Sequence, residues 1–441
     1  MDILLQNNVI LIYMLITRIK ASNFYGIKDP IEVTFTEGGE KEKIGYANIE
    51  KERVALISGF YGANASGKST ILNIIDTLTR VMVTKQQEFI LALNGIKTET
   101  VISNPSYSIT MKSKPIVMEM DFIIEEVIYN YLISIVNEGT EISEEVLYKN
   151  NKKIFSRNNH KVLFEGNIEK KIEEKIGVIA KNIVAPKKSS FLSVILDDSS
   201  DISVFANLKE EIGISNLNQI KTKFCFITDK RSVQMGQNNL NGLLAFAVNY
   251  LNSNSEAQTK MLGIVNPIVK YFEPSFESLV IKKESDNDPV NKSFAFTYEA
   301  KYSNFYKNLG VMELSAGTRE LISYIVDIFR ILKIGGVVVY DETSKYYHPD
   351  MEIAILNLFK DKDINKNNAQ LFFSSHNHET FDLLQNDQAH ILEKKDDNII
   401  VSKVSDYDVK ERDNIKRVYR LGSLGGIPNT IDFNRIISNL L

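Results

Sequence analysis

Residues 53–75 read RVALISGFYGANASGKSTILNII, an apolar run, a glycine-rich loop and a second apolar run in succession. The apolar run Val54 to Ile57 predicts a short buried strand, and ILNII at 71–75 predicts a helix. Between them GANASGKS, from Gly62 to Ser69, matches G-x-x-x-x-G-K-[ST], the pattern of a phosphate-binding loop. A chance glycine turn before a helix is the alternative. The strand on one side and the helix on the other favour the phosphate loop.

The residue types in this loop suit a triphosphate. Small residues let backbone N–H groups surround phosphate oxygens, and the helix N-terminus adds partial positive charge. We expect Lys68 to reach the β and γ phosphates and the Ser69 hydroxyl to ligate Mg²⁺. The sequence therefore predicts ATP and Mg²⁺ as cofactors, with contacts from Gly62, Asn64, Ala65, Ser66, Gly67, Lys68, Ser69 and Thr70.

A second stretch, GGVVVYDETSKYYHPD at 335–350, supplies acidic groups. Val337 to Tyr340 reads as a buried strand, with Asp341 and Glu342 at its C-terminal end, where ligands gather in parallel α/β sheets. We predict that Asp341 holds Mg²⁺ and that Glu342 orients the attacking water or accepts its proton. A solvated pair of acids is the alternative.

Two further segments flank this strand in the sequence. LSAGT at 314–318 precedes a periodic helix, which makes Ser315 and Gly317 candidates for a second anion-binding helix start. The alternative is that Ser315 only caps a core helix. Downstream, Leu371 to Ser374 predicts a strand, and His376 follows it as a candidate γ-phosphate contact or a structural histidine. The letters H-N-H at 376–378 lack the spacing of a nuclease site.

The order of these motifs resembles the ABC-class ATPases. Within that class the chain looks like the RecF/SMC-type heads, and more closely like the stand-alone ATPases of bacterial antiphage and abortive-infection systems. The opening ITRIKASNFYGIKDPIEVTF at 16–35 is similar to the first strands of such heads. The resemblance covers 14–75 and 310–395 and is weak between them.

The resemblance implies a composite site. Two heads would dimerise head-to-tail around two ATP molecules, and Ser315 and Gly317 of one head would meet the γ-phosphate held by the other. Glu342 would be the catalytic base and His376 the switch histidine, and Thr343 to His348 would form the loop that crosses the interface. LSAGT replaces the LSGGQ of transporters, and Gln86 and Gln87 lie too early to be the Mg²⁺-sensing glutamine.

The resemblance and the residue patterns together predict an α/β fold: an ABC-type P-loop ATPase head with a mixed sheet, flanking helices and an antiparallel β subdomain. The alternating pattern from Val117 to Ile135 predicts a hairpin. From about 166 the period becomes helical through Ile183, and further helices are predicted at 202–212, 238–251 and 256–271. KDDN at 395–398 predicts a hairpin turn between HILEK and IIVSK. The predicted domains are a head in two parts, 14–165 and 276–405, a helical lid or partner-binding insertion at 166–275, and a docking tail at 406–441.

Composition limits the class of protein. The chain has 441 residues, 44% hydrophobic and 24% charged, with a net charge of -4, as in an ordinary globular protein rather than a basic nucleic-acid binder. The one cysteine, Cys225, excludes a zinc hook and fits a reducing cytoplasm. No apolar run approaches the roughly 20 residues of a membrane-spanning helix, so we expect no membrane partner. Met14 is an alternative start to Met1.

The leading functional hypothesis is an ATP-hydrolysing switch or sensor in antiphage defence, acting as a homodimer or higher homo-oligomer and gating a separate effector protein. The first alternative is a DNA-repair ATPase that contacts DNA directly, for which Lys187, Lys188, Lys221 and Lys223 form only weak basic clusters. The second is a slow-turnover scaffold that sequesters an effector. The 65 residues after His376 are too few for a fused TOPRIM nuclease.

Overall fold

The strand that precedes the glycine-rich loop forms in the middle of a six-stranded sheet and is buried along its whole length. The structure is a computed structural model, and it describes residues 13–39, 42–49, 52–83, 113–137, 139–176, 183–197, 208–227, 255–283, 296–310, 313–343, 348–410, 414–427, 437–438 and 440. In spatial order the strands of the central sheet are β12 (Phe224–Ile227), β16 (Val337–Tyr340), β17 (Gln370–Ser374), β6 (Ile57–Tyr61), β18 (Ala389–Lys395) and β19 (Asn398–Lys403).

Every pairing in this sheet except β18–β19 is parallel. Because these strands are parallel, the C-terminal ends of β6, β16 and β17 lie at the same edge of the sheet. Parallel α/β sheets bind ligands at this edge. The antiparallel pair β18–β19 turns at Asp396 and Asp397, whose positive φ angles of 48° and 61° suit a two-residue hairpin. This confirms the predicted turn between the two strands.

A second sheet is antiparallel and has seven strands. The predicted hairpin is confirmed, since β7 and β8 pair from Ile116↔Ile135 to Ile124↔Val127. The strands are β1 (Met14–Ser22), β2 (Ile31–Thr34), β7 (Ile116–Ile124), β8 (Val127–Val136), β9 (Glu141–Lys149), β10 (Lys152–Asn158) and β11 (Lys161–Phe164). A small third sheet holds β3 (Thr36–Gly38), β4 (Tyr46–Ile49) and β5 (Glu52–Ala55).

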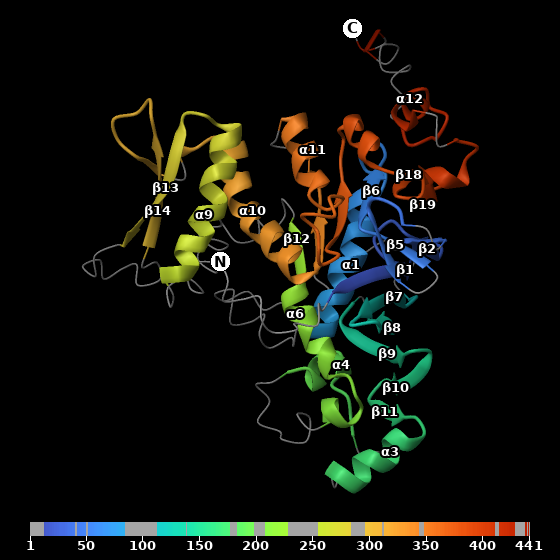
Figure 1. Ribbon diagram of the computed structural model, residues 1–441. Coiled ribbons are helices and arrows are strands. Elements are labelled where there is room, and N and C mark those ends of the chain that lie inside the picture. Colours follow the sequence, from blue (N-terminus) through green and yellow to red (C-terminus); the bar gives the residue numbers. More distant parts are fainter. Residues whose placement is uncertain are drawn as a thin grey trace.

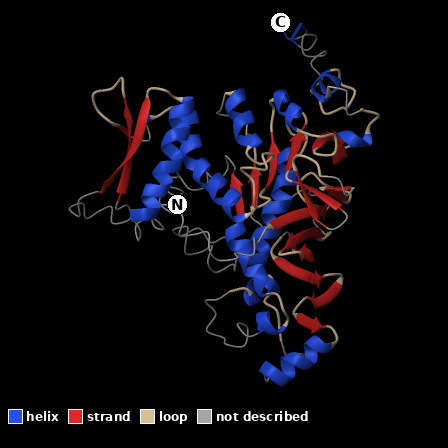
Figure 2. Ribbon diagram, in the orientation of Figure 1, coloured by secondary structure: helices blue, strands red, loops and turns tan. Residues whose placement is uncertain are grey.

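The helix that follows the glycine-rich loop, α1 (Lys68–Val83), lies between the two large sheets (Figure 2). One cluster of buried side chains joins Ile71 and Ile75 of α1 to Met118 of β7 and Phe372 of β17. A helix that is apolar on most of its surface is stable only when both of its sides are covered. The sheets therefore hold α1, and with it the start of the loop, between two layers.

The side chain of Gln370 ties the two sheets together where their backbones meet. Its amide oxygen accepts from the Ile16 N–H at 2.7 Å, and its amide nitrogen donates to the carbonyls of Ile16 at 2.9 Å and Ala55 at 2.8 Å. Gln370 is fully buried, and these bonds satisfy its polar atoms. The base of β17 is thus joined to β1 through a side chain.

The other face of the central sheet carries helices and a β module (Figure 1). The predicted helix at 256–271 is present as α9, which packs beside α10 and the strand pair β13–β14. The elements are α9 (Ser255–Phe272), β13 (Phe276–Lys283), β14 (Phe296–Tyr302), β15 (Leu309–Gly310), α10 (Ala316–Ile334) and α11 (Pro349–Asn357). Together with the two sheets they give the predicted α/β class: a mixed sheet, flanking helices and an antiparallel β subdomain.

The range 166–275 is helical only in part. Its short helices are α3 (Asn167–Lys171), η2 (Ile172–Ile176), α4 (Phe191–Ile195), η4 (Ser215–Gln219) and α6 (Ile220–Lys223). The sequence predicts a helical pattern through Ile183. In the structure Ile183 is not helical, and Val184 forms a β-bridge with Lys161. The range also supplies β12, a strand that the helical interpretation did not predict. The predicted helix at 238–251 lies outside the described residues, and the domain boundaries stay a prediction.

The C-terminal part of the chain folds back over the central sheet. α12 (Ile415–Arg420) packs against η6 (His378–Leu383), and η7 (Val404–Asp406) follows β19.

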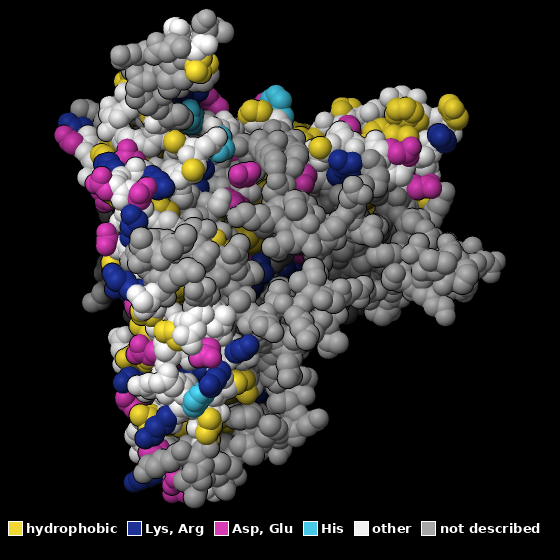
Figure 3. All heavy atoms as spheres, turned by 180° about the vertical axis from the view of Figure 1, so that it is seen from behind, with side chains coloured by type: hydrophobic (Ala, Val, Ile, Leu, Met, Phe, Trp, Pro, Cys, Tyr) yellow, Lys and Arg dark blue, Asp and Glu magenta, His cyan; other side chains and the backbone are white. Residues whose placement is uncertain are grey.

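No helix among the described residues is long and apolar enough to cross a membrane. On the face seen from behind, Lys and Arg side chains alternate with Asp and Glu over the described surface, without a stripe of one sign (Figure 3).

Candidate functional site

The glycine-rich loop depends on two glycines. Gly62 has φ of 157°, and a Cβ there would lie 2.5 Å from both the Leu392 carbonyl oxygen and the Ser66 Oγ. Gly67 has φ of 105°, and a Cβ there would lie 2.5 Å from Cδ1 of Ile399. Both positions combine a backbone conformation that side chains rarely adopt with no room for one. The fixed glycines of the motif are therefore required by the local packing.

Lys68, the first residue of α1, folds back over the loop. Its Nζ donates hydrogen bonds to the carbonyls of Gly62 at 2.9 Å and Ala63 at 3.0 Å. Burial lowers the pKa of Lys68, and the nearby carboxylates of Asp341 and Glu342 oppose that shift. Ser66 is buried, and its hydroxyl has no hydrogen-bond partner among the described residues. The loop therefore holds one cation and one unpaired hydroxyl group.

The two acids predicted at the end of β16 are held by Ser374, the last residue of β17. The Ser374 hydroxyl donates to Asp341 Oδ1 at 2.6 Å and accepts from the Glu342 N–H at 2.8 Å. Glu342 has a positive φ of 58°, which is uncommon for a residue other than glycine. Asp341 is buried and Glu342 is exposed, so the strand end presents one carboxylate to the sheet and one to the pocket.

His376 follows β17 and faces the same space. Burial lowers the pKa of His376, the charges of Lys68 and His378 lower it further, and Asp341 acts in the opposite direction. A lowered pKa keeps the imidazole neutral near pH 7, and a neutral ring can donate one hydrogen bond and accept another.

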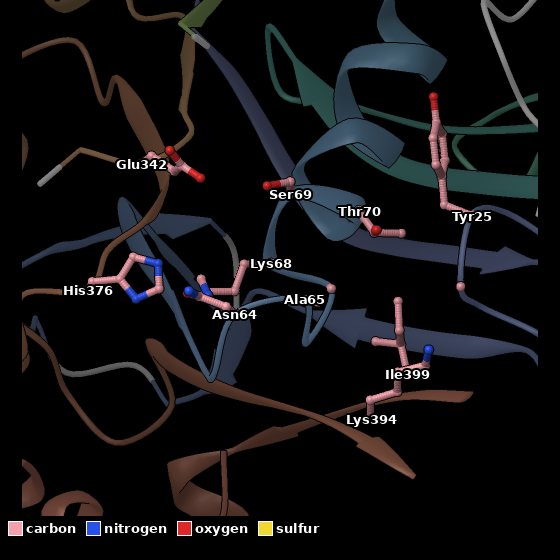
Figure 4. Close-up of a pocket in the computed structure, with 12 residues that line it drawn as sticks. Tyr25, Asn64, Ala65, Lys68, Ser69, Thr70, Glu342, His376, Lys394 and Ile399 are labelled. Atoms are coloured by element: carbon pink, nitrogen blue, oxygen red, sulfur yellow. The ribbon is translucent and has the colours of Figure 1, made fainter. Parts of the chain in front are cut away.

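These side chains line one pocket with a volume of about 720 Å³ (Figure 4). Figure 4 shows Glu342 and His376 at one end of this pocket and Tyr25 and Ile399 at the other, with the loop between them. Eight residues predicted from the sequence line the pocket: Asn64, Ala65, Gly67, Lys68, Ser69, Thr70, Glu342 and His376. Four that the sequence reasoning missed are Tyr25, Gly26, Lys394 and Ile399.

Tyr25 and Gly26 come from the turn between β1 and β2 of the seven-stranded sheet, and Lys394 and Ile399 come from β18 and β19, so only the tertiary fold brings them to the loop. The residue pair Asn23-Phe24, beside Tyr25, was the available sequence signal for this end of the site. Gly62, Ser66 and Asp341 lie behind the lining, in contact with it.

Ser315 and Gly317 lie elsewhere. They line a second pocket of about 220 Å³ together with Phe272, Glu273 and His348. Ser315 caps α10, since its hydroxyl accepts from the Thr318 N–H at 3.1 Å. The predicted cap is therefore present, and within one chain the LSAGT segment does not line the phosphate-loop pocket, so its anion-binding role stays a prediction.

Oxygen ligands suitable for Mg²⁺ are present at the phosphate loop. Ser69 offers a hydroxyl and Asp341 a carboxylate, which are the ligand types that Mg²⁺ prefers. Within the described ranges, no group of three or more His, Cys, Asp or Glu side chains is placed to hold a metal ion. This fits a metal that would be held by one or two protein oxygens and by substrate phosphates.

No protein-family model matches the chain, and no curated protein matches it. Solved structures similar to it include an SMC head bound to the C-winged helix domain of ScpA, with 12% identity, 89% of this chain and 99% of that chain covered, and a TM-score of 0.43. Another is the SMC head domain from Thermotoga maritima, with 11% identity, 88% and 98% covered, and a TM-score of 0.39. A third is the Pyrococcus furiosus Smc head with an extended coiled coil, bound to the C-terminal domain of ScpA, with 12% identity, 89% and 97% covered, and a TM-score of 0.41.

Proposed function

We propose that the chain binds and hydrolyses ATP as an ABC/SMC-like switch or sensor. The observation that carries the proposal is the shared pocket, in which the phosphate loop with Lys68 and Ser69 faces Glu342 and His376 across a space of about 720 Å³. Pockets of this size hold ligands the size of a nucleotide. The carboxylate and the histidine stand at the end where a γ-phosphate would lie.

The geometry suggests an orientation for the substrate. The base and ribose would lie toward Tyr25 and Ile399, and the phosphates would run along the loop toward Glu342 and His376. On binding, Lys68 would exchange its bonds to the Gly62 and Ala63 carbonyls for phosphate oxygens.

Hydrolysis then needs a base and charge stabilisation. Glu342 orients a water and accepts its proton as the water oxygen bonds to the γ-phosphorus and the bond to the β-phosphate bridging oxygen breaks. Neutral His376 donates a hydrogen bond to a γ-phosphate oxygen. Mg²⁺ held by Ser69 and Asp341 would neutralise charge that develops on the phosphates.

The LSAGT segment supports a dimeric form of the site. Ser315 and Gly317 begin a 19-residue helix, whose N-terminus attracts anions, yet they line a pocket separate from the phosphate loop. In the proposed homodimer or higher homo-oligomer, this segment of one copy meets the γ-phosphate held by another copy. The proposed setting, antiphage defence with a separate effector, rests on the sequence resemblance.

The test is Glu342→Gln, which removes the base and keeps the size of the side chain. We expect the ATP Kd to stay within about 3-fold, turnover to fall at least about 100-fold, and an ATP-dependent dimer to accumulate. Calorimetry, phosphate release and light scattering measure these three quantities. The matched control is Asp363→Asn, at an exposed acid in the turn after α11.

A wild-type chain that does not bind ATP would overturn the proposal. If Glu342→Gln keeps wild-type turnover, the base is assigned wrongly. If the wild type binds ATP and dimerises but releases no phosphate, the chain is the ATP-bound scaffold considered above. Stimulation of turnover by DNA would favour the repair alternative.

A further inference from the structure

A buried carboxylate lies behind the pocket and is not part of its lining. Glu352, on α11, is 1% exposed. Its Oε1 accepts hydrogen bonds from the hydroxyls of Thr343 and Ser375, the latter at 2.7 Å, and its Oε2 accepts from Asn377 Nδ2 at 2.9 Å. Burying a carboxylate is costly unless hydrogen bonds compensate, and here three donors converge on it.

The donors come from two loops that carry the proposed catalytic side chains. Thr343 directly follows Glu342, while Ser375 and Asn377 stand on either side of His376. These loops leave neighbouring parallel strands, β16 and β17, and one carboxylate therefore holds both. The Thr343 N–H also donates to the Ser374 carbonyl at 3.0 Å. This backbone hydrogen bond joins the loop after β16 to the end of β17.

The loop after β16 needs such support because Glu342 is in the left-handed region with φ of 58°. For a residue other than glycine this conformation is strained and persists only where neighbouring contacts impose it. The Ser374 hydroxyl holds the Glu342 N–H on one side, and Glu352 holds the Thr343 side chain on the other. The backbone at Glu342, and with it the point from which the side chain leaves, is held between these two contacts.

We propose that Glu352 is a positioning residue that sets Glu342 and His376 at a fixed separation across the γ-phosphate end of the pocket. The proposal rests on the proposed ATP hydrolysis and adds a residue that touches no substrate. A purely structural Glu352 would affect folding stability and leave turnover per folded molecule unchanged. A positioning Glu352 controls turnover while ATP binding, which depends on the phosphate loop, stays intact.

The hydrogen-bond pattern permits a reciprocal swap as the test. In Glu352→Gln the new amide nitrogen meets donors in either orientation: the Asn377 amide nitrogen at the position of Oε2, or the Thr343 and Ser375 hydroxyls at the position of Oε1. In Asn377→Asp two carboxylates face each other. In the double variant Glu352→Gln/Asn377→Asp the new amide donates to the new carboxylate. The other carboxylate oxygen can still accept from the Glu379 N–H, as Asn377 Oδ1 does at 3.0 Å.

We expect each single variant to lower kcat about 10- to 100-fold, the range seen when a supporting hydrogen bond behind a catalytic ligand is lost. We expect the ATP Kd to stay within about 3-fold, because the phosphate loop is untouched. The double variant should recover kcat to within about 3-fold of wild type, which would show that the two side chains act through their mutual hydrogen bond. Asp363→Asn serves as the exposed-acid control.

The proposal is overturned if the single variants turn over ATP like wild type. It is also overturned if the loss of kcat in the double variant equals the product of the losses of kcat in the two single variants. In either case, ATP hydrolysis by the wild-type protein still supports the ATPase assignment. If the wild-type protein does not hydrolyse ATP, the ATPase assignment itself is wrong. If the Glu352 variants do not fold, Ser375→Ala removes one hydroxyl donor with little change in volume. A loss of kcat with unchanged KM then supports the proposal, and unchanged kcat overturns it.

Discussion

His390 shows how a single side chain makes the fold sensitive to acid. It is fully buried in β18, with its ring stacked on Phe60 at a centroid distance of 4.9 Å, and Phe35 lies 5.7 Å away. Neither ring nitrogen has a hydrogen-bond partner among the described residues. Burial, with a smaller contribution from Lys403, lowers the pKa of His390 to about 3, and the backbone groups of Gly59, Gln388 and Thr34 nearby oppose this shift only in part. The ring is therefore neutral in the folded protein.

We predict that His390→Phe makes the free energy of unfolding fall less steeply as the pH is lowered. The folded-state pKa lies below the unfolded value of about 6.5, so the unfolded chain takes up a proton first and stability is lost as pH falls from 6.5 toward 3. At pH 4.5 this costs about 3 kcal/mol relative to pH 8. Urea titrations of both proteins at several pH values measure the difference, and parallel curves would contradict the prediction.

At the residue scale, the sequence predicts side chains whose chemistry follows a local motif. Lys68, Ser69 and Glu342 belong to such motifs, and all three line the same pocket. Ser374 and Glu352 were missed, because a serine at a strand end and an acid in a nine-residue helix have no pattern of their own. Their importance comes from partners in other segments, and the pairing of β16 with β17 places those partners.

At the element scale, α10 is held at both ends by side chains. At its start, Ser315 accepts from the Thr318 N–H. At its end, Gly335 takes a left-handed conformation with φ of 65°, and Lys223 donates to the carbonyls of Ile334 and Gly335. Burial lowers the pKa of Lys223 to about 8. The helix is thereby fixed in register between its LSAGT start and β16.

We predict that Ser315→Ala lowers the free energy of unfolding by about 1 kcal/mol through loss of the cap, and that it also abolishes ATP turnover. The control is Ser190→Ala, which removes the cap of α4, where the buried Ser190 hydroxyl accepts from the Ser193 N–H at 2.8 Å and donates to the Val81 carbonyl at 2.6 Å. We expect the control to lose stability and keep turnover. Normal turnover in Ser315→Ala would restrict this serine to a structural role.

Elements with a strong local period were predicted well. The β7–β8 and β18–β19 hairpins and α9 lie where alternation or helical spacing indicates them. β12 was missed because its four residues follow directly on a helix, and only pairing with β16 makes them a strand. Four apolar residues are too short a run to distinguish strand from helix, so the tertiary contact decides.

At the scale of the whole molecule, the C-terminal segment covers the site from behind. Tyr419 of α12 is buried, with its ring 5.1 Å from those of both Phe381 and His378, and its hydroxyl donates to the Gly426 carbonyl at 3.0 Å. A Cβ on Gly426 would lie 3.5 Å from the Cα of Gly62. The segment at 414–427 therefore touches both the start of the phosphate loop and the helix that follows His376.

We predict that Tyr419→Ala lowers the free energy of unfolding by about 3 kcal/mol, because it removes a large buried ring. It should also weaken ATP binding, since Gly426 loses its hydrogen bond and the backing of Gly62 loosens. Thermal unfolding and calorimetry measure the two effects. Tyr306→Ala, at a side chain that is 100% exposed, is the matched control and should change neither. An unchanged ATP Kd in Tyr419→Ala would show that the segment at 414–427 does not support ATP binding.

The position of β6 between β17 and β18 has a consequence for synthesis on the ribosome. β6 ends at Tyr61, but its neighbours begin at Gln370 and Ala389, so its hydrogen bonds on both sides await segments made more than 300 residues later. At about 5–20 residues per second, the nascent β6 stays without these partners for roughly 15–65 s. Such long-range pairing slows folding and leaves an apolar strand open to aggregation. The phosphate loop is thus encoded early in the chain and can take its final shape only after nearly the whole chain has been made.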